Sequence, residues 1–151
     1  MRAAGRRLAQ LAFCAALLAP GACEDLRQFS GDWDGEVSHD LQHQLGFTPG
    51  AKLHATVGSA RREKLELALG LPGRTDLLPF DSIGHAADDV LGDVRLPGEP
   101  LRTYFGFVTP PAALPYLTVV SLFGENRVEV RLIRGASEAY GVFYLARPPA
   151  R

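Results

Sequence analysis

The feature that most constrains the fold is a period-two alternation of apolar and polar residues, which recurs in short runs after residue 30. Leu65, Leu67 and Leu69 alternate with Lys64 and Glu66. Successive side chains of a strand point to opposite faces, so such a run predicts a strand with one buried face and one solvated face. This arrangement is typical of antiparallel sheets. The same alternation occurs in three further runs, at 33–37, 53–57 and 128–132.

Four more strands are predicted from apolar runs at 90–96, 101–108, 116–123 and 140–146. The last three of these are apolar on both faces, so we expect them to lie against a helix, a second sheet or a partner. The tightest predicted hairpin joins 116–123 to 127–133 through the short turn at 124–126. The least regular segment, 74–89, is predicted to be a long loop or a short helix.

Short strands separated by turns predict an all-β fold. The favoured architecture is an antiparallel up-and-down β-barrel of about eight strands, and a β-sandwich is the alternative. A closed barrel leaves no exposed strand edge. This property suits an exported chain that has no disulfide.

The N-terminus has the plan of a secretory signal peptide over residues 1–22. Arg2, Arg6 and Arg7 supply a positive start, and an apolar run follows at 8–19. The run is too short to span a bilayer, which needs roughly 20 apolar residues. We therefore expect the protein to be exported.

The chain has two cysteines, Cys14 inside the apolar run and Cys23 four residues after its end. Cleavage after Ala22 would leave Cys23 as the first residue and as a lone thiol, which has no disulfide partner within the chain. The stretch "LAPGACEDL" resembles a bacterial lipoprotein processing site, although Pro20 stands where a leucine-like residue is usual. The resemblance implies a lipid anchor of the palmitate type on Cys23, at the cell envelope and facing the periplasm or the exterior. A soluble periplasmic or secreted protein, or a thiol paired between chains, is the alternative.

Without residues 1–22 the 151-residue chain would hold 129 residues, which is a typical size for one domain. The expected order is a lipidated tether and lead-in at 23–30, a barrel domain at 31–147 and a tail at 148–151. Removing the three leader arginines leaves 13 of 16 basic residues against 17 acidic ones, a net charge of −4. This balance argues against nucleic acid as a partner.

The stretch "LRQFSGDWDGEV" carries a second resemblance. Its Gly-x-Trp motif, Gly31 to Trp33, preceded by apolar Leu26 and Phe29, resembles the opening of a lipocalin or a related calycin barrel. The resemblance implies that Trp33 plugs one end of the barrel and that an arginine after the last strand packs across the indole. Arg147 is the first candidate for this barrel-closing role, and Arg134 is the second.

Two other interpretations of the same stretch stay open. The motif also resembles the Gly-x-Trp-x-Gly opening of nitrobindin-like barrels, but no haem-ligating histidine is evident in the sequence, and we expect no cofactor. Alternatively, Trp33 is simply a large core residue on a first strand.

An eight-stranded barrel either fills its interior with side chains or holds one small ligand. Apolar residues expected to line a ligand site are Leu53, Val57, Leu67, Phe105, Phe107, Val119 and Phe143. Four tyrosines could add hydroxyl groups to such a site, namely Tyr104, Tyr116, Tyr140 and Tyr144. A mostly apolar site with a few polar groups suits a small apolar or amphipathic molecule.

Residue types that support catalysis or metal binding do occur, but their spacing is weak. His39 and His43 could share a metal, and Ser82 with His85 could begin a hydrolytic triad completed by Asp88 or Asp89. No third metal ligand and no Gly-x-Ser-x-Gly motif accompanies them, so we interpret these residues as solvated loops. We expect neither a metal site nor enzymatic activity.

The sequence therefore predicts an exported lipoprotein whose barrel binds a small apolar or amphipathic ligand without catalysis. The alternative is a structural or interaction module that binds another protein of the envelope. An open apolar cavity would favour the first function, and a filled core with an exposed apolar patch would favour the second.

Overall fold

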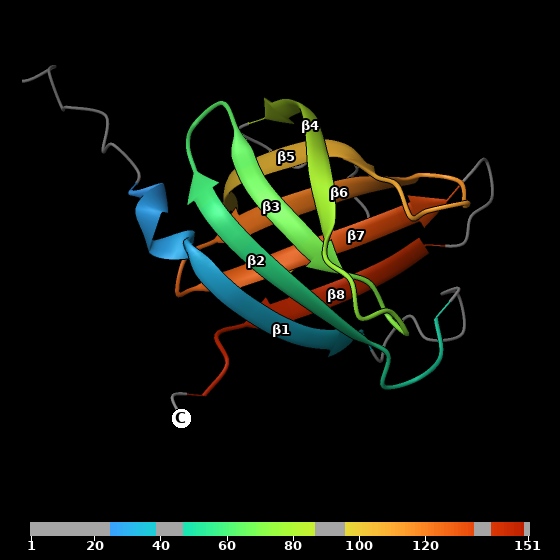
Figure 1. The fold of residues 1–151 in the computed structure, drawn as a ribbon. Coiled ribbons are helices and arrows are strands. Elements are labelled where there is room, and N and C mark those ends of the chain that lie inside the picture. Colours follow the sequence, from blue (N-terminus) through green and yellow to red (C-terminus); the bar gives the residue numbers. More distant parts are fainter. Residues whose placement is uncertain (1–24, 39–46, 87–95, 135–139, 150–151) are drawn as a thin grey trace, which may run out of the picture.

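In a computed structural model of the protein, eight strands form one closed barrel (Figure 1). The structure describes residues 25–38, 47–86, 96–134 and 140–149. A short 3₁₀ helix, η1, precedes the first strand. The elements are η1 (Leu26–Phe29), β1 (Gly31–Val37), β2 (Lys52–Ala60), β3 (Leu65–Gly70), β4 (Leu78–Ala86), β5 (Pro100–Val108), β6 (Tyr116–Phe123), β7 (Arg127–Arg134) and β8 (Tyr140–Ala146).

Every strand pairs in antiparallel fashion with its neighbours in sequence, and β8 pairs with β1 to close the barrel. The prediction of an all-β up-and-down barrel is therefore confirmed, and the sandwich is not formed. The hairpin of β6 and β7 is also confirmed, with Phe123 opposite Arg127 and the turn at 124–126 between them.

The prediction for segment 74–89 was wrong, because most of it forms β4. Leu78 and Phe80 are buried while Pro79 and Asp81 are exposed, so the strand alternates at its start. The alternation is obscured further along the strand, where the pairing with β5 shifts register between Ser82 and Gly84. The strand predicted at 90–96 lies outside the described residues except for its last position.

The pairing between β3 and β4 is the shortest in the barrel. Only Ala68 with Pro79 and Leu69 with Leu78 are in register there. Proline has no N–H group to donate and is confined to such weakly paired positions. Beyond this point β3 and β4 diverge (Figure 1), and residues 81–86 pair only with β5 among the described strands.

The core lies inside the barrel, and period-two alternation decides which residues belong to it. On β6, for example, Val120 and Leu122 belong to the core, whereas Val119 and Ser121 point to the outer side of the wall. The largest fully buried side chains include Trp33, Tyr104, Phe29 and Phe143.

One end of the barrel, which we call the floor, is sealed around Trp33. The indole is fully buried, stacks on Phe29 with ring centroids 5.8 Å apart and donates from Nε1 to the Phe29 carbonyl at 2.8 Å. The guanidinium carbon of Arg147 lies 4.1 Å from the centroid of the indole ring, and the same side chain donates to the Gln28 carbonyl. Gly31 has a φ of +108°, and a Cβ atom there would lie 2.8 Å from the Arg147 guanidinium, so the position requires glycine.

We expect Trp33→Ala to lower the free energy of unfolding by about 3–5 kcal/mol, because it removes a fully buried indole and leaves a cavity at the floor. Urea unfolding followed by circular dichroism would measure the change. Leu114→Ala, at a residue that is 64% exposed, is the control and should be near neutral. An equally small effect of Trp33→Ala would show that the floor does not depend on the indole.

Candidate functional site

The topology gives the barrel two different ends. The floor carries η1 together with the turns at 61–64 and 124–126. The opposite end, which we call the mouth, is formed where β1, β3, β5 and β7 finish. The segments that leave the mouth are 38–51, 71–77, 109–115 and 135–139. Because the floor is sealed by Trp33, the mouth is the end at which a ligand could reach the apolar interior.

Phe47 lies across the mouth. Its ring meets that of Phe143 edge to face, with centroids 5.4 Å apart, and lies 6.4 Å from that of Tyr116. A Cβ atom at Gly141 would be 2.5 Å from the Phe47 ring, so the absence of a side chain at Gly141 makes room for it. Phe47 belongs to no strand and is held by ring packing.

The mouth also has a cationic group at its rim. The guanidinium carbon of Arg134, at the end of β7, lies 5.5 Å from the centroid of the Tyr116 ring. Tyr116 pairs directly with Arg134 across the strands and packs against the core. An apolar interior with an arginine at its entrance suits an amphipathic molecule that has an anionic end.

Four of the seven residues expected to line the interior belong to the buried core, namely Leu53, Val57, Leu67 and Phe143. The expectation was wrong for Phe105, Phe107 and Val119. Phe105 pairs with Val119 on the outer side of the wall, and Phe107 is 37% exposed.

The physical reason for this error is that β5 and β6 are apolar on both faces. In β5 the inward positions belong to Arg102, Tyr104 and Val108, which are all buried. Tyr104 is fully buried, and its hydroxyl donates to the Arg61 carbonyl at 2.5 Å. Of the other tyrosines, Tyr116 lies at the mouth as described, and Tyr144 is half-buried on β8.

Only two of the catalytic and metal candidates from the sequence, Ser82 and His85, are among the described residues. His39, His43, Asp88 and Asp89 lie outside them. Ser82 and His85 are on the same strand, β4, on either side of its register shift. Within the described ranges, no group of three or more histidine, cysteine, aspartate or glutamate side chains could hold a metal ion.

One acidic residue of the predicted loops has a clear role. Asp76 accepts two hydrogen bonds from the Arg74 guanidinium, each at 2.8 Å. These hydrogen bonds lower the pKa of the Asp76 carboxyl group and raise the pKa of Arg74. The pair lies in the β3–β4 connection at the mouth end and is exposed, so it stabilises a turn.

A polar cluster on the outside of β1 and β2 was not predicted. His54 Nδ1 lies 2.7 Å from Asp34 Oδ1, and Thr56 donates to Asp32 at 2.9 Å. The two contacts join residues that are directly opposite each other in the β1–β2 register. The cluster is therefore a cross-strand ladder on a solvated face. Predicting it would have required the strand register.

A second missed feature is a buried ion pair on the outer side of β7. Glu129 Oε1 and Arg131 Nε lie 2.9 Å apart, and both side chains are almost completely buried. Glu129 also accepts a hydrogen bond from the Leu96 amide at 2.5 Å. The alternation of Glu129 and Arg131 with valines indicated a solvated face, so the burial of this pair could not be predicted from the pattern.

Among residues 25–38, 47–86, 96–134 and 140–149, no helix is both long enough and apolar enough to cross a membrane.

Comparisons of the chain with protein-family models, with curated proteins and with solved structures give no match.

Proposed function

We propose that this protein is an exported lipoprotein, anchored through Cys23, whose barrel binds a small apolar or amphipathic molecule without catalysis. The closed eight-stranded barrel is compatible with ligand binding. The signal-peptide pattern of residues 1–22 and the lone thiol of Cys23 support export and anchoring.

The observation that carries the binding proposal is the placement of Phe47. The floor is sealed by stacked and hydrogen-bonded groups, whereas at the mouth the described residues place Phe47, whose ring belongs to no strand, against Phe143. A ligand that displaces this ring would meet Phe143 and the apolar core behind it. Arg134 at the rim would pair with an anionic head group of an amphipathic ligand.

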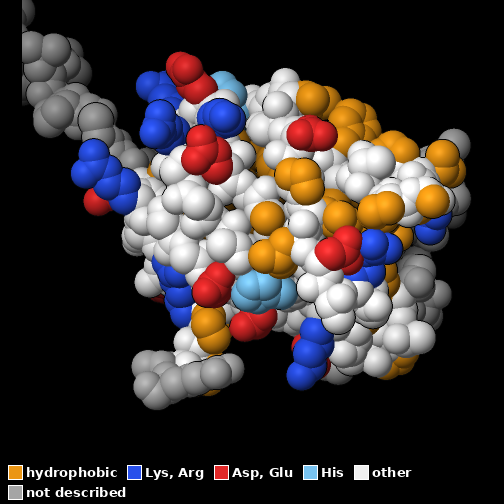
Figure 2. Space-filling view, viewed as in Figure 1, with side chains coloured by type: hydrophobic (Ala, Val, Ile, Leu, Met, Phe, Trp, Pro, Cys, Tyr) orange, Lys and Arg blue, Asp and Glu red, His pale blue; other side chains and the backbone are white. Residues whose placement is uncertain are grey.

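A second candidate function is docking of another envelope protein on the outside of the barrel. Large apolar side chains are exposed on β4, on β5 and in the adjoining segments, namely Leu77 (50%), Ile83 (62%), Phe107 (37%) and Leu114 (64%). Figure 2 shows hydrophobic side chains gathered on the side of the molecule that carries β4, β5 and β6. Exposed apolar patches of this kind mark interaction sites.

Phe47→Ala is expected to raise the association rate of cis-parinaric acid, a fluorescent fatty acid, because the ring that covers the mouth is gone. Stopped-flow fluorescence would measure the rate, and equilibrium titration the stoichiometry, which should be one per chain. Leu114→Ala removes an apolar side chain outside the barrel and should leave the rate unchanged. If neither the native protein nor Phe47→Ala binds the probe, the interior is not a ligand site.

Cys23→Ser should abolish acylation. Intact-mass measurement of the native protein from membranes is expected to show residues 23–151 with added acyl mass, and the variant should carry none. Once its leader is removed, the variant should fractionate with soluble proteins. A native protein that never carries acyl mass would refute the anchor and leave the binding proposal to the Phe47 experiment.

A photo-crosslinking residue at Ile83 should capture one discrete envelope protein in cells if docking is the function. The control position is Lys52, an exposed residue on β2 with its ammonium 3.7 Å from Glu36. Equal capture at both positions would mean that the apolar face has no specific partner.

A further inference from the structure

Arg102 is a buried cation for which the described residues supply no counter-ion. It lies near the start of β5, opposite Leu122 of the core, and only 9% of the residue is exposed. Its Nε atom is buried and has no hydrogen-bond partner in the described part of the chain. Burying a charge is costly unless the charge is paired. The position therefore calls for an anion.

The other buried arginine among the described residues, Arg131, does have a carboxylate partner. That guanidinium lies on the outer side of the wall and has Glu129 at 2.9 Å. No carboxylate of the described residues is within ion-pair distance of Arg102. The difference sets Arg102 apart as a group whose charge the described residues do not compensate.

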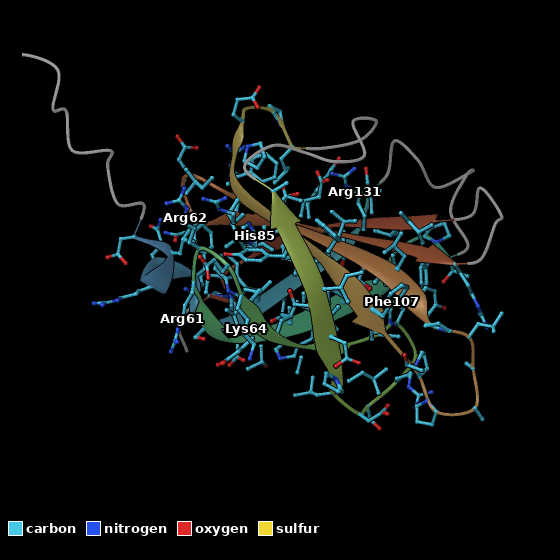
Figure 3. All side chains as sticks on the ribbon, turned by 90° about the horizontal axis from the view of Figure 1, so that it is seen from above. Arg61, Arg62, Lys64, His85, Phe107 and Arg131 are labelled. Carbon is cyan, nitrogen blue, oxygen red and sulfur yellow. The ribbon has the colours of Figure 1, made fainter. Side chains whose placement is uncertain are left out.

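Basic residues lie at the same end of the barrel as Arg102, which is near the start of β5. Tyr104, two residues further along the same face of β5, donates to the Arg61 carbonyl and so ties the turn at 61–64 to this strand. His85 pairs with Tyr104 from the neighbouring strand β4. Figure 3 shows His85 at the same end of the barrel as Arg61, Arg62 and Lys64, with Phe107 far from them.

The Glu66 carboxylate interacts with this rim through the charge of Arg61, but it forms no ion pair with Arg61 in the described part of the chain. Glu66 is engaged by the Ser59 hydroxyl at 2.9 Å and by the Lys64 ammonium at 3.6 Å, and these contacts lower the pKa of its carboxyl group. Glu63 is exposed on the turn. Among the described residues, Arg61 and Arg62 have no ion-pair partner.

From this arrangement we infer an oxyanion-binding site at the floor end, centred on Arg102 and rimmed by Arg61, Arg62 and His85. A phosphate or carboxylate group would accept hydrogen bonds from the buried guanidinium, in the charge-assisted geometry that arginine favours. The site is separate from the mouth, where Phe47 lies, and it does not depend on the proposed lipid anchor.

The oxyanion could be free or part of a lipid head group. Asp25, the first described residue, is two residues after Cys23, and two extended residues span about 7 Å. A lipid on Cys23 would therefore hold the floor end within about one Debye length of the membrane surface. Lipid phosphates would then be close to Arg61 and Arg62.

The test uses the native protein in non-ionic detergent micelles, labelled with ¹⁵N-arginine, so that the Nε–H signal of Arg102 is followed directly. Arg102→Met identifies the signal by its loss. Inorganic phosphate is expected to shift this signal in a saturable manner, whereas sodium chloride at equal ionic strength should not. Phosphatidylglycerol added to the micelles tests the lipid source.

A shift with phosphate alone assigns the site to a free oxyanion, and a shift with phosphatidylglycerol alone assigns it to a lipid head group. A shift with both supports the site and leaves it open to either source. No shift with either probe, or an equal shift with chloride, overturns the inference. Acylation of Cys23 is measured separately by mass, so failure here would not be confused with failure of the anchor.

Thermal unfolding gives a second readout. Phosphate should raise the Tm of the native protein, because a ligand that binds only the folded state stabilises it. Arg102→Met should have a higher Tm than the native protein without phosphate, because it replaces an unpaired buried charge with an apolar side chain, and it should lose the phosphate effect.

Variants at the rim complete the design. Arg61→Ser/Arg62→Ser leaves Arg102 in place and should weaken phosphate affinity about fivefold or more. The matched control, Lys52→Ser/Arg74→Ser, removes two exposed cations at the mouth end and should leave the affinity unchanged. If the rim and control variants behave alike, Arg61 and Arg62 are not part of the site.

Discussion

The contact between the Arg147 guanidinium and the Trp33 indole is the interaction on which the rest of the barrel depends. It joins the first strand to the residue that directly follows the last strand, at the edge where β1 and β8 must meet for the barrel to close. Arg147 also donates to carbonyls of Gln28 and Asp32, so the same side chain fixes η1 over the floor. The closure of the barrel, the seal at the floor and the position of the N-terminal lead-in therefore all depend on Arg147 and its cation–π contact with Trp33.

The floor is sealed in this way, and polar side chains occupy only a few of the described positions that point into the barrel. The interior is otherwise apolar, yet Arg102 lies on its inward face and Tyr104 spans it to reach the Arg61 carbonyl. The Tyr104 hydroxyl links β5 to the turn at 61–64 on the side where β3 and β4 have stopped pairing. This hydrogen bond holds together the least well paired part of the wall.

The strands with one polar face were predictable from the sequence, because in β2 and β3 the buried residues are the apolar half of each alternation. For β5 and β6, the sequence did not indicate which residues point into the barrel and which point outward. Both of their faces are apolar, so Phe105 and Phe107 were assigned to the interior that Tyr104 and Val108 occupy. Strand β4 was not predicted, because Pro79 and the register shift between Ser82 and Gly84 obscure its alternation. The site at the mouth was missed because Phe47 reaches Phe143 only through tertiary packing.

The two ends of the barrel differ in a way that bears on both proposals. At the part of the floor around Trp33, side chains are locked by hydrogen bonds to backbone and by a positive-φ glycine, so the indole plug has little freedom to move. At the mouth, Phe47 packs against the rings of Phe143 and Tyr116, and such aromatic contacts are worth about 0.5–1.5 kcal/mol each beyond the area they bury. A ligand that replaces those contacts with its own apolar surface would lose little by displacing the ring. An apolar tail therefore suits the mouth, while an oxyanion suits Arg102 at the opposite end.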